Sequence, residues 1–84
     1  MKVYLTPPAQ KDLDRLPDKV ALRITFLIKD LENNPYPAGS KKLKGWGKTY
    51  RARLGDYRVI YEIDLNQKSI IITRVKHRKD IYRN

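Results

Sequence analysis

The side chains of this sequence that could carry chemistry are arginines, a histidine and a tyrosine. They form two groups, one in the middle of the chain and one near its end, namely Arg51, Arg53, Arg58, His77, Arg78 and Tyr82. This set suits cleavage of RNA without a metal ion, in which the ribose 2′-hydroxyl attacks the adjacent phosphorus. That reaction needs a proton acceptor, a proton donor for the leaving 5′-oxygen, and cations that stabilise the charge building on the phosphate.

Arginine fits this chemistry because its guanidinium stays charged and its planar fork matches phosphate oxygens. The arginines of both groups are therefore candidate phosphate ligands. Tyr82 can accept a proton only where neighbouring cations stabilise its phenolate, since a free phenol has a pKa of about 10. Other interpretations stay open, because strand arginines can simply solvate an open sheet face, and Tyr82 can stack on a base or pack on the sheet.

His77 is the one histidine of the sequence, which limits the options for acid–base chemistry. Histidine is a common general acid or base, but a single histidine cannot supply both halves of a two-histidine mechanism, so we assign it to RNA binding more readily than to proton transfer. A lysine-rich segment adds unspecific attraction for a polyanion through Lys41, Lys42, Lys44 and Lys48. Within it, Trp46 can stack on RNA or fold back on its own loop.

Other chemistries lack the residues they need. One histidine, no cysteine and scattered acids predict no metal site, and the glycines at 45 and 47 lack the spacing of a phosphate-binding loop, so no cofactor is expected. Lys and Arg number 19 against 9 for Asp and Glu, and the net charge of +10 favours a nucleic acid or an acidic protein as partner, although the same excess can serve solubility alone.

Membrane insertion is not expected either. No apolar run approaches the roughly 20 residues that cross a bilayer, and the amino terminus lacks the apolar stretch of a secretory signal. We therefore expect a soluble intracellular protein.

The elements that must position these residues follow from periodicity. Residues 2–5 alternate like a half-buried strand. Thr6 followed by a proline predicts the start of a helix, and Pro17 begins a second helix that runs to about Asn33. Prolines and a glycine predict a linker loop over residues 33–39. The two helices form a hairpin whose apolar stripe must cover the strands that follow.

A period of two begins at Thr49 and predicts two strands joined by a tight turn at Gly55-Asp56. In this register the arginines of the middle group point to one face and the apolar residues to the other. A second turn near Asn66-Gln67 leads to an apolar strand over residues 70–75.

These elements predict an α+β fold in one domain over residues 1–84. It consists of a mainly antiparallel four-stranded sheet, an N-terminal helical hairpin packed on one face, and a short C-terminal tail or helix. The uncovered face carries the arginines, and we expect the function there.

Three runs of the sequence resemble the RelE/ParE toxin superfamily, namely KLKG at residues 42–45, YRARLGDYRVIY at residues 50–61 and HRKDIY at residues 77–82. The predicted order of elements is similar to that fold as well, so the resemblance covers nearly the whole chain. It implies the toxin of a type II toxin–antitoxin system. Such a RelE-like toxin is a metal-independent endoribonuclease that cuts mRNA in the ribosomal A site and inhibits translation in the cytoplasm.

The resemblance also implies roles for individual residues. Arg58 and Arg78 would stabilise the transition state, with Arg78 a candidate proton donor for the leaving group, and Tyr82 would orient or activate the nucleophile. We assign RNA binding to four further residues, Arg51, Arg53, Lys44 and His77. Arg51 and Arg53 stand where some relatives have lysines, so proton transfer by a lysine at those two positions does not apply here.

The partners implied by the resemblance are a cognate acidic antitoxin, the A site of the 30S ribosome and mRNA, with operator DNA bound only through the antitoxin. The charge of +10 fits an acidic partner, because complementary charge accelerates encounter. Two alternatives remain. One is a ParE-like inhibitor of DNA gyrase, and the other is a non-catalytic RNA- or ribosome-binding module, which needs the basic face but not Tyr82.

Overall fold

The computed structural model describes residues 1–43 and 47–81. Lys44, Trp46 and Tyr82, considered above, lie outside the described residues. The helices are α1 (Pro7–Asp14), α2 (Asp18–Asn33) and α3 (Arg78–Ile81). The strands are β1 (Lys2–Leu5), β2 (Lys41–Lys42), β3 (Thr49–Leu54), β4 (Tyr57–Asp64) and β5 (Ser69–His77). None of these helices is long and apolar enough to cross a membrane.

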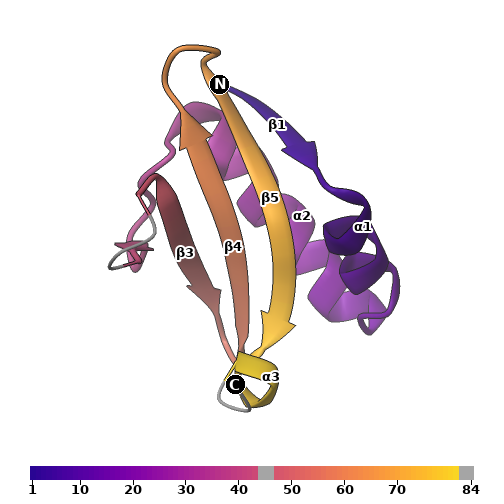
Figure 1. Cartoon of the computed structure of the whole chain (residues 1–84). Coiled ribbons are helices and arrows are strands. Elements are labelled where there is room, and N and C mark those ends of the chain that lie inside the picture. Colours follow the sequence, from indigo (N-terminus) through magenta and orange to yellow (C-terminus); the bar gives the residue numbers. More distant parts are fainter. Residues whose placement is uncertain (44–46, 82–84) are drawn as a thin grey trace.

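The strands form one sheet in the order β1-β5-β4-β3-β2 (Figure 1). The pairing of β1 with β5 is parallel and the other pairings are antiparallel. The predicted α+β class with a mainly antiparallel sheet is confirmed, but the sheet has five strands rather than four. The additional strand, β2, pairs through Lys41 and Lys42 alone, and so short a strand leaves no periodicity to detect in the sequence.

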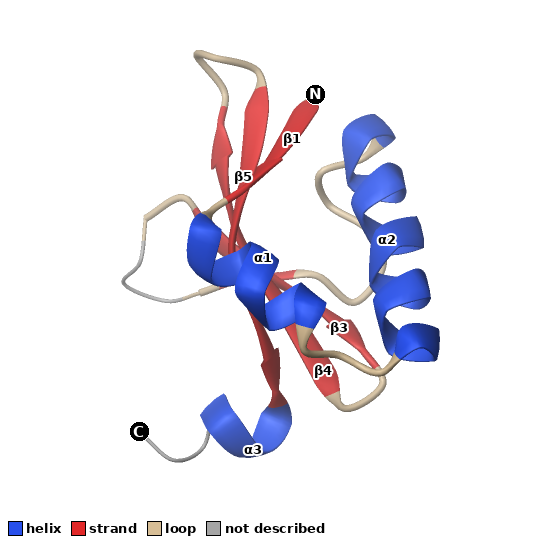
Figure 2. Ribbon diagram, turned by 90° about the vertical axis from the view of Figure 1, so that its right-hand side faces the viewer, coloured by secondary structure: helices blue, strands red, loops and turns tan. Residues whose placement is uncertain are grey.

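The core lies between α2 and one face of the sheet (Figure 2). Its buried apolar side chains come from both helices and from β3, β4 and β5, and they are Ala9, Ile24, Leu31, Ala52, Val59, Tyr61, Ile63, Ile70, Ile72 and Val75. The core members of β3 and β4 recur at every second residue, as the period of two predicted, although half-buried Ile60 in β4 and Ile71 in β5 occupy two of the positions between core residues. The opposite face of the sheet is not covered by α1 or α2.

The hairpin turn predicted at Gly55-Asp56 is confirmed, because Leu54 pairs directly with Tyr57 across it. Gly55 has a φ of 58°, whereas Asp56 is not among the residues with positive φ. A positive φ at the first central position is the arrangement of a type II′ turn, which glycine adopts without steric cost.

A cluster of tyrosines holds the linker loop that follows α2. The hydroxyl of Tyr61 donates to the carbonyl of Pro35 at 2.8 Å. The ring of Tyr50 lies between those of Tyr36 and Tyr61, with centroid distances of 5.5 and 5.9 Å. Burial raises the pKa of Tyr61, which keeps its hydroxyl available as a donor. The loop is thereby fixed on β3 and β4 at the point where it leads into β2.

A bulge in β5 shifts its alternation by one residue. Ile60 pairs with Arg74 and Tyr61 pairs with Ile72, so the strand register leaves Thr73 opposite no residue of β4. The hydroxyl of Thr73 donates to the backbone carbonyl of Ile60 at 3.1 Å. After the bulge the side chains exchange faces. Arg74 therefore points to the open face, where an unbroken period of two would have placed it in the core.

The edge of β5 continues beyond the end of β1, and residues around α1 satisfy its backbone groups. The amide of Thr6 donates to the carbonyl of Ile72 at 3.0 Å. The hydroxyl of Thr6 donates to the carbonyl of Thr73 at 2.9 Å and accepts from the amide of Ala9, which makes Thr6 the N-cap of α1 as predicted. One side chain thus caps a helix and binds a strand edge.

Asp12 completes this edge. Its carboxylate accepts from the amide of Val75 at 3.0 Å and from Nε and Nη2 of Arg74 at 2.7 and 3.0 Å. Burial opposes ionisation of Asp12, but the hydrogen bonds from Arg74 and Val75 and the charges of Arg74 and Lys76 outweigh it and hold the pKa of Asp12 below its ordinary value. We call this arrangement of Asp12, Arg74 and Val75 the edge clamp.

We predict that Asp12→Asn lowers the free energy of unfolding at neutral pH by about 2 kcal/mol, because charged hydrogen bonds to a largely buried carboxylate are lost. The folded pKa of Asp12 lies below its unfolded value, so its contribution is present above about pH 4 and is lost as the pH falls through the folded pKa. Urea unfolding from pH 7 to pH 2 should show a shallower decline in Asp12→Asn than in the wild type. Parallel curves would contradict the role of the edge clamp.

Candidate nucleic-acid interface

Basic side chains of β3, β4 and β5 meet on the open face of the sheet. Arg53 pairs with Arg58, and Arg58 pairs with Lys76, so these three cations form one row across three strands. Directly paired residues point to the same face, and neighbouring strands lie about 4.8 Å apart. Such close cations repel one another and favour a polyanion that neutralises them. We call these three residues the cationic row.

The next position along the strands adds two further arginines. Arg51 pairs with Ile60, and Ile60 pairs with Arg74. Of the acidic residues near this face, Asp12 is already bonded to Arg74, and Glu62 lies further along β4, 3.9 Å from the ammonium of Lys48. The positive charge is therefore concentrated at the end of the sheet near the β3–β4 turn.

Arg58 is the most buried member of the cationic row. Its exposed fraction is 9 %, whereas Arg53 is exposed and Lys76 is half-buried. No buried side-chain nitrogen or oxygen among the described residues lacks a hydrogen-bond partner. A buried and bonded guanidinium is already oriented before a phosphate arrives, which is the property that electrostatic stabilisation of a transition state requires.

The structure brings Arg78 to the same end of the sheet. Its amide donates to the carbonyl of Asp56 in the β3–β4 turn at 2.8 Å, and its Nη1 lies 4.0 Å from Oδ1 of Asp56. Both side chains are more than half exposed, so the ion pair is weak and its arginine can be recruited by a stronger anion. Arg78 thus stands beside the strand ends that carry Arg53 and Arg58.

His77 is placed apart from these arginines. It pairs with Tyr57, which shares the core-facing side of β4 with Val59 and Tyr61. The rings of His77 and Tyr57 meet edge to face, with centroids 5.1 Å apart. The Nδ1 of His77 accepts from the amide of Lys79 at 3.2 Å, in the first turn of α3. The candidate RNA-binding residue His77 therefore lies at the end of β5, on the same side of the sheet as Tyr57, and is not part of the cationic row.

Lys76 belongs to the site but could not be found from periodicity. Continuing the spacing of Ile70 and Ile72 would place Lys76 on the covered face, and the bulge at Thr73 reverses this assignment. One sequence signal could have revealed the bulge. The apolar core residues are two positions apart from Ile70 to Ile72, but three positions apart from Ile72 to Val75, with a threonine between them.

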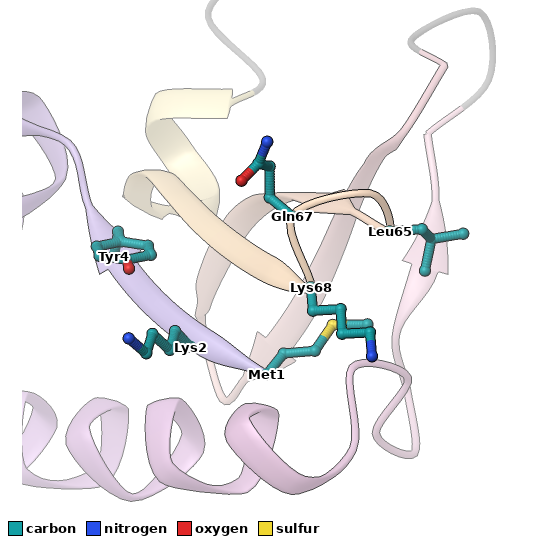
Figure 3. A pocket seen from close by; sticks show the side chains of 6 residues that line it. All are labelled: Met1, Lys2, Tyr4, Leu65, Gln67 and Lys68. Carbon is teal, nitrogen blue, oxygen red and sulfur yellow. The ribbon is translucent and has the colours of Figure 1, made fainter.

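A hollow of about 740 Å³ lies at the other end of the sheet (Figure 3). It is lined by Met1, Lys2, Tyr4, Leu65, Gln67 and Lys68. These residues belong to the start of β1 and the β4–β5 loop, whereas α3 follows β5 at the opposite end (Figure 1). The hollow is therefore separate from the cationic row. Among the described residues, no group of three or more His, Cys, Asp or Glu side chains is placed to hold a metal ion.

Comparison with known proteins gives consistent matches over nearly the whole chain. The family described as the ParE toxin of the type II toxin-antitoxin system parDE matches residues 3–82. Toxin RelG of Mycobacterium tuberculosis is 38% identical over 96% of this chain and 94% of its own. Toxin RelE3 of Methanocaldococcus jannaschii is 38% identical over 98% and 96%. The crystal structure of the archaeal RelE-RelB complex from Pyrococcus horikoshii contains a chain that is 38% identical, with a TM-score of 0.82 and coverage of 92% and 93%.

We predict that Arg53→Gln weakens binding of a single-stranded oligouridylate and lowers the slope of log affinity against log salt by about 0.7, the value for one phosphate contact on a single strand. Arg23→Gln, an equally exposed arginine on α2, should leave the slope unchanged. Fluorescence anisotropy over a series of salt concentrations measures both. Equal slopes for the two variants would remove Arg53 from the interface.

Proposed function

Since the chain belongs to the ParE toxin family of type II toxin–antitoxin systems, we propose that it is a ribosome-dependent endoribonuclease that cuts mRNA in the A site of the cytoplasmic 30S ribosome. The observation that carries this proposal is the cationic row of Arg53, Arg58 and Lys76 with Arg78 beside it. RNA cleavage of this kind needs cations at the scissile phosphate and no metal ion.

The proposed reaction is attack of the 2′-oxygen on the adjacent phosphorus. The new 2′-O–P bond forms as the P–O5′ bond breaks, which leaves a 2′,3′-cyclic phosphate and a 5′-hydroxyl. Arg58 is suited to the non-bridging oxygens because it is oriented before binding. DNA lacks the attacking hydroxyl and would not be cut by this route.

Two proton transfers accompany this attack. The 2′-hydroxyl loses a proton, and the leaving 5′-oxygen gains one. The ammonium of Lys76 or the guanidinium of Arg78 supplies the donor, and lysine gives up a proton far more readily than arginine. Tyr82, which lies outside the described residues, remains our proposal for orienting or activating the nucleophile, on the basis of the resemblance alone.

Cleavage of a defined mRNA with and without programmed ribosomes tests the proposal. Cuts within the A-site codon should require ribosomes and should slow by about 10²-fold in Arg78→Ala and in Lys76→Met, the effect of removing one donor to a developing negative charge. Tyr82→Phe should also reduce the rate, and Arg23→Gln should not.

Absence of cuts under every condition would overturn the nuclease proposal. The ParE description of the matching family makes inhibition of DNA gyrase the next activity to measure, by a supercoiling assay. Binding of ribosomes without cleavage would instead indicate a non-catalytic module.

We further propose that an acidic antitoxin binds this chain, and that the complex contacts operator DNA through the antitoxin alone. Two observations support such a partner, the net charge of +10 and the solved complexes of related RelE toxins with RelB.

On α2 the side chains of Leu22 and Phe26 are 58% and 57% exposed, one helical turn apart. A hollow of about 220 Å³ beside them is lined by Arg23, Phe26, Leu27, Asp30 and Leu54. An apolar patch on a helix, bordered by one basic and one acidic residue, fits the apolar side of an amphipathic segment.

We predict that Phe26→Ser weakens antitoxin binding by about tenfold or more, because exposed aromatic residues at an interface often contribute over 1.4 kcal/mol. Leu65→Ser is a matched control, since Leu65 is 66% exposed but lies in the β4–β5 loop. Surface plasmon resonance with the cognate antitoxin measures both variants. Unchanged affinity in Phe26→Ser would show that the antitoxin binds elsewhere, and the nuclease assay is independent of this result.

A further inference from the structure

Another cleft lies beside the last residues of β5, where this strand faces α1 and is no longer paired with β1. Its volume is about 480 Å³, within the range of roughly 300 to 1,000 Å³ typical of small-molecule sites. The segment that joins α1 to α2 forms one side, and the last residues of β5 form the other. We call it the edge cleft.

The charges of the edge cleft favour an anion. Three cations line it, Arg15, Arg74 and Lys76, against one carboxylate, that of Asp12. Asp12 already accepts hydrogen bonds from Arg74 and from the amide of Val75, so its charge is engaged within the edge clamp. Arg74 is engaged in the same clamp, so the excess positive charge of the lining comes from Arg15 and Lys76.

The other part of the lining is apolar and aromatic. Pro17 and Tyr57 contribute to it, and His77 meets Tyr57 edge to face at 5.1 Å. A cationic side next to an aromatic side matches the two halves of a nucleotide, whose phosphate is an anion and whose base has an apolar π-face. Inorganic phosphate alone would make no use of the aromatic side.

Lys76 connects the edge cleft to the cationic row, because it lines the cleft and also pairs with Arg58 on the open face. A strand whose phosphate lies on Arg58 can therefore continue past Lys76 around the edge of β5. We infer that the edge cleft binds one nucleotide unit of an RNA strand, next to the nucleotide held on the cationic row. This inference rests on the proposed function for the path of the strand.

Arg15 provides the test, since it lines the edge cleft but is not part of the cationic row. The probe is a labelled RNA trinucleotide with 2′-deoxy substitutions at its first and central sugars, which remove the attacking hydroxyl at both of its linkages. Arg15→Gln should weaken its binding by three- to tenfold and lower the salt slope by about 0.7. Arg15→Lys should restore most of the affinity, and Lys29→Gln, at an exposed cation on α2, should behave as the wild type.

Several results would overturn the inference. Equal affinities for Arg15→Gln and Lys29→Gln would remove the edge cleft from the RNA path. Binding of uridine 5′-monophosphate as tight as that of the trinucleotide would indicate a free nucleotide as the ligand rather than a strand. Loss of binding to a glutamate-rich peptide, with the trinucleotide unaffected, would assign the cleft to a protein partner.

The same variants separate this inference from the proposed function. The trinucleotide is not cut, so its binding is measured whether or not the chain cleaves mRNA on ribosomes. Binding that depends on Arg15 in a protein without nuclease activity would support the edge cleft and overturn the nuclease. Normal cleavage with an unchanged KM in Arg15→Gln would support the nuclease and overturn the cleft.

Discussion

The edge of strand β5, which β1 leaves partly uncovered, is the constraint on which this structure depends. A parallel partner, β1, covers that edge only as far as Ile72, and the backbone groups beyond it need other partners because unpaired buried amides are costly. Thr6 and Asp12 supply them from the segment that begins and forms α1. The same carboxylate of Asp12 holds Arg74 at the edge of the open face. The carboxylate of Asp12 therefore both attaches α1 to the sheet and positions Arg74.

The sheet separates its two faces by charge, and this separation opposes stability at the open face. Apolar strand residues pack against α2, while cations paired across neighbouring strands repel one another. A chain of 84 residues buries a modest core and has little excess stability to offset such repulsion. A polyanion, whether RNA or an acidic protein, would neutralise the open face and stabilise the fold on binding.

Much of this fold could be predicted because its signals are local. The Thr6 cap, the long helix α2, the turn at Gly55-Asp56 and the alternation of β3 and β4 each depend on a few adjacent residues. Features that depend on distant contacts could not be predicted. Asp12 is separated by 62 residues from Arg74, and the bulge that redirects Lys76 depends on how β5 pairs with β4. The position of Arg51, Arg53 and Arg58 on the open face was therefore predicted, but that of Lys76 was not. The roles assigned to the site residues all stay predictions.

The position of β5 in the sequence has a consequence for biosynthesis. This strand is the last of the sheet to be translated, yet it lies between β1 and β4 and pairs with both. The hydroxyl of Thr6 bonds to a carbonyl 67 residues further along, so the sheet cannot close while the chain is still short. A nascent chain has no assembled basic face until Lys76 and Arg78 have been synthesised. The order of translation itself thus delays the appearance of the surface to which RNA would bind.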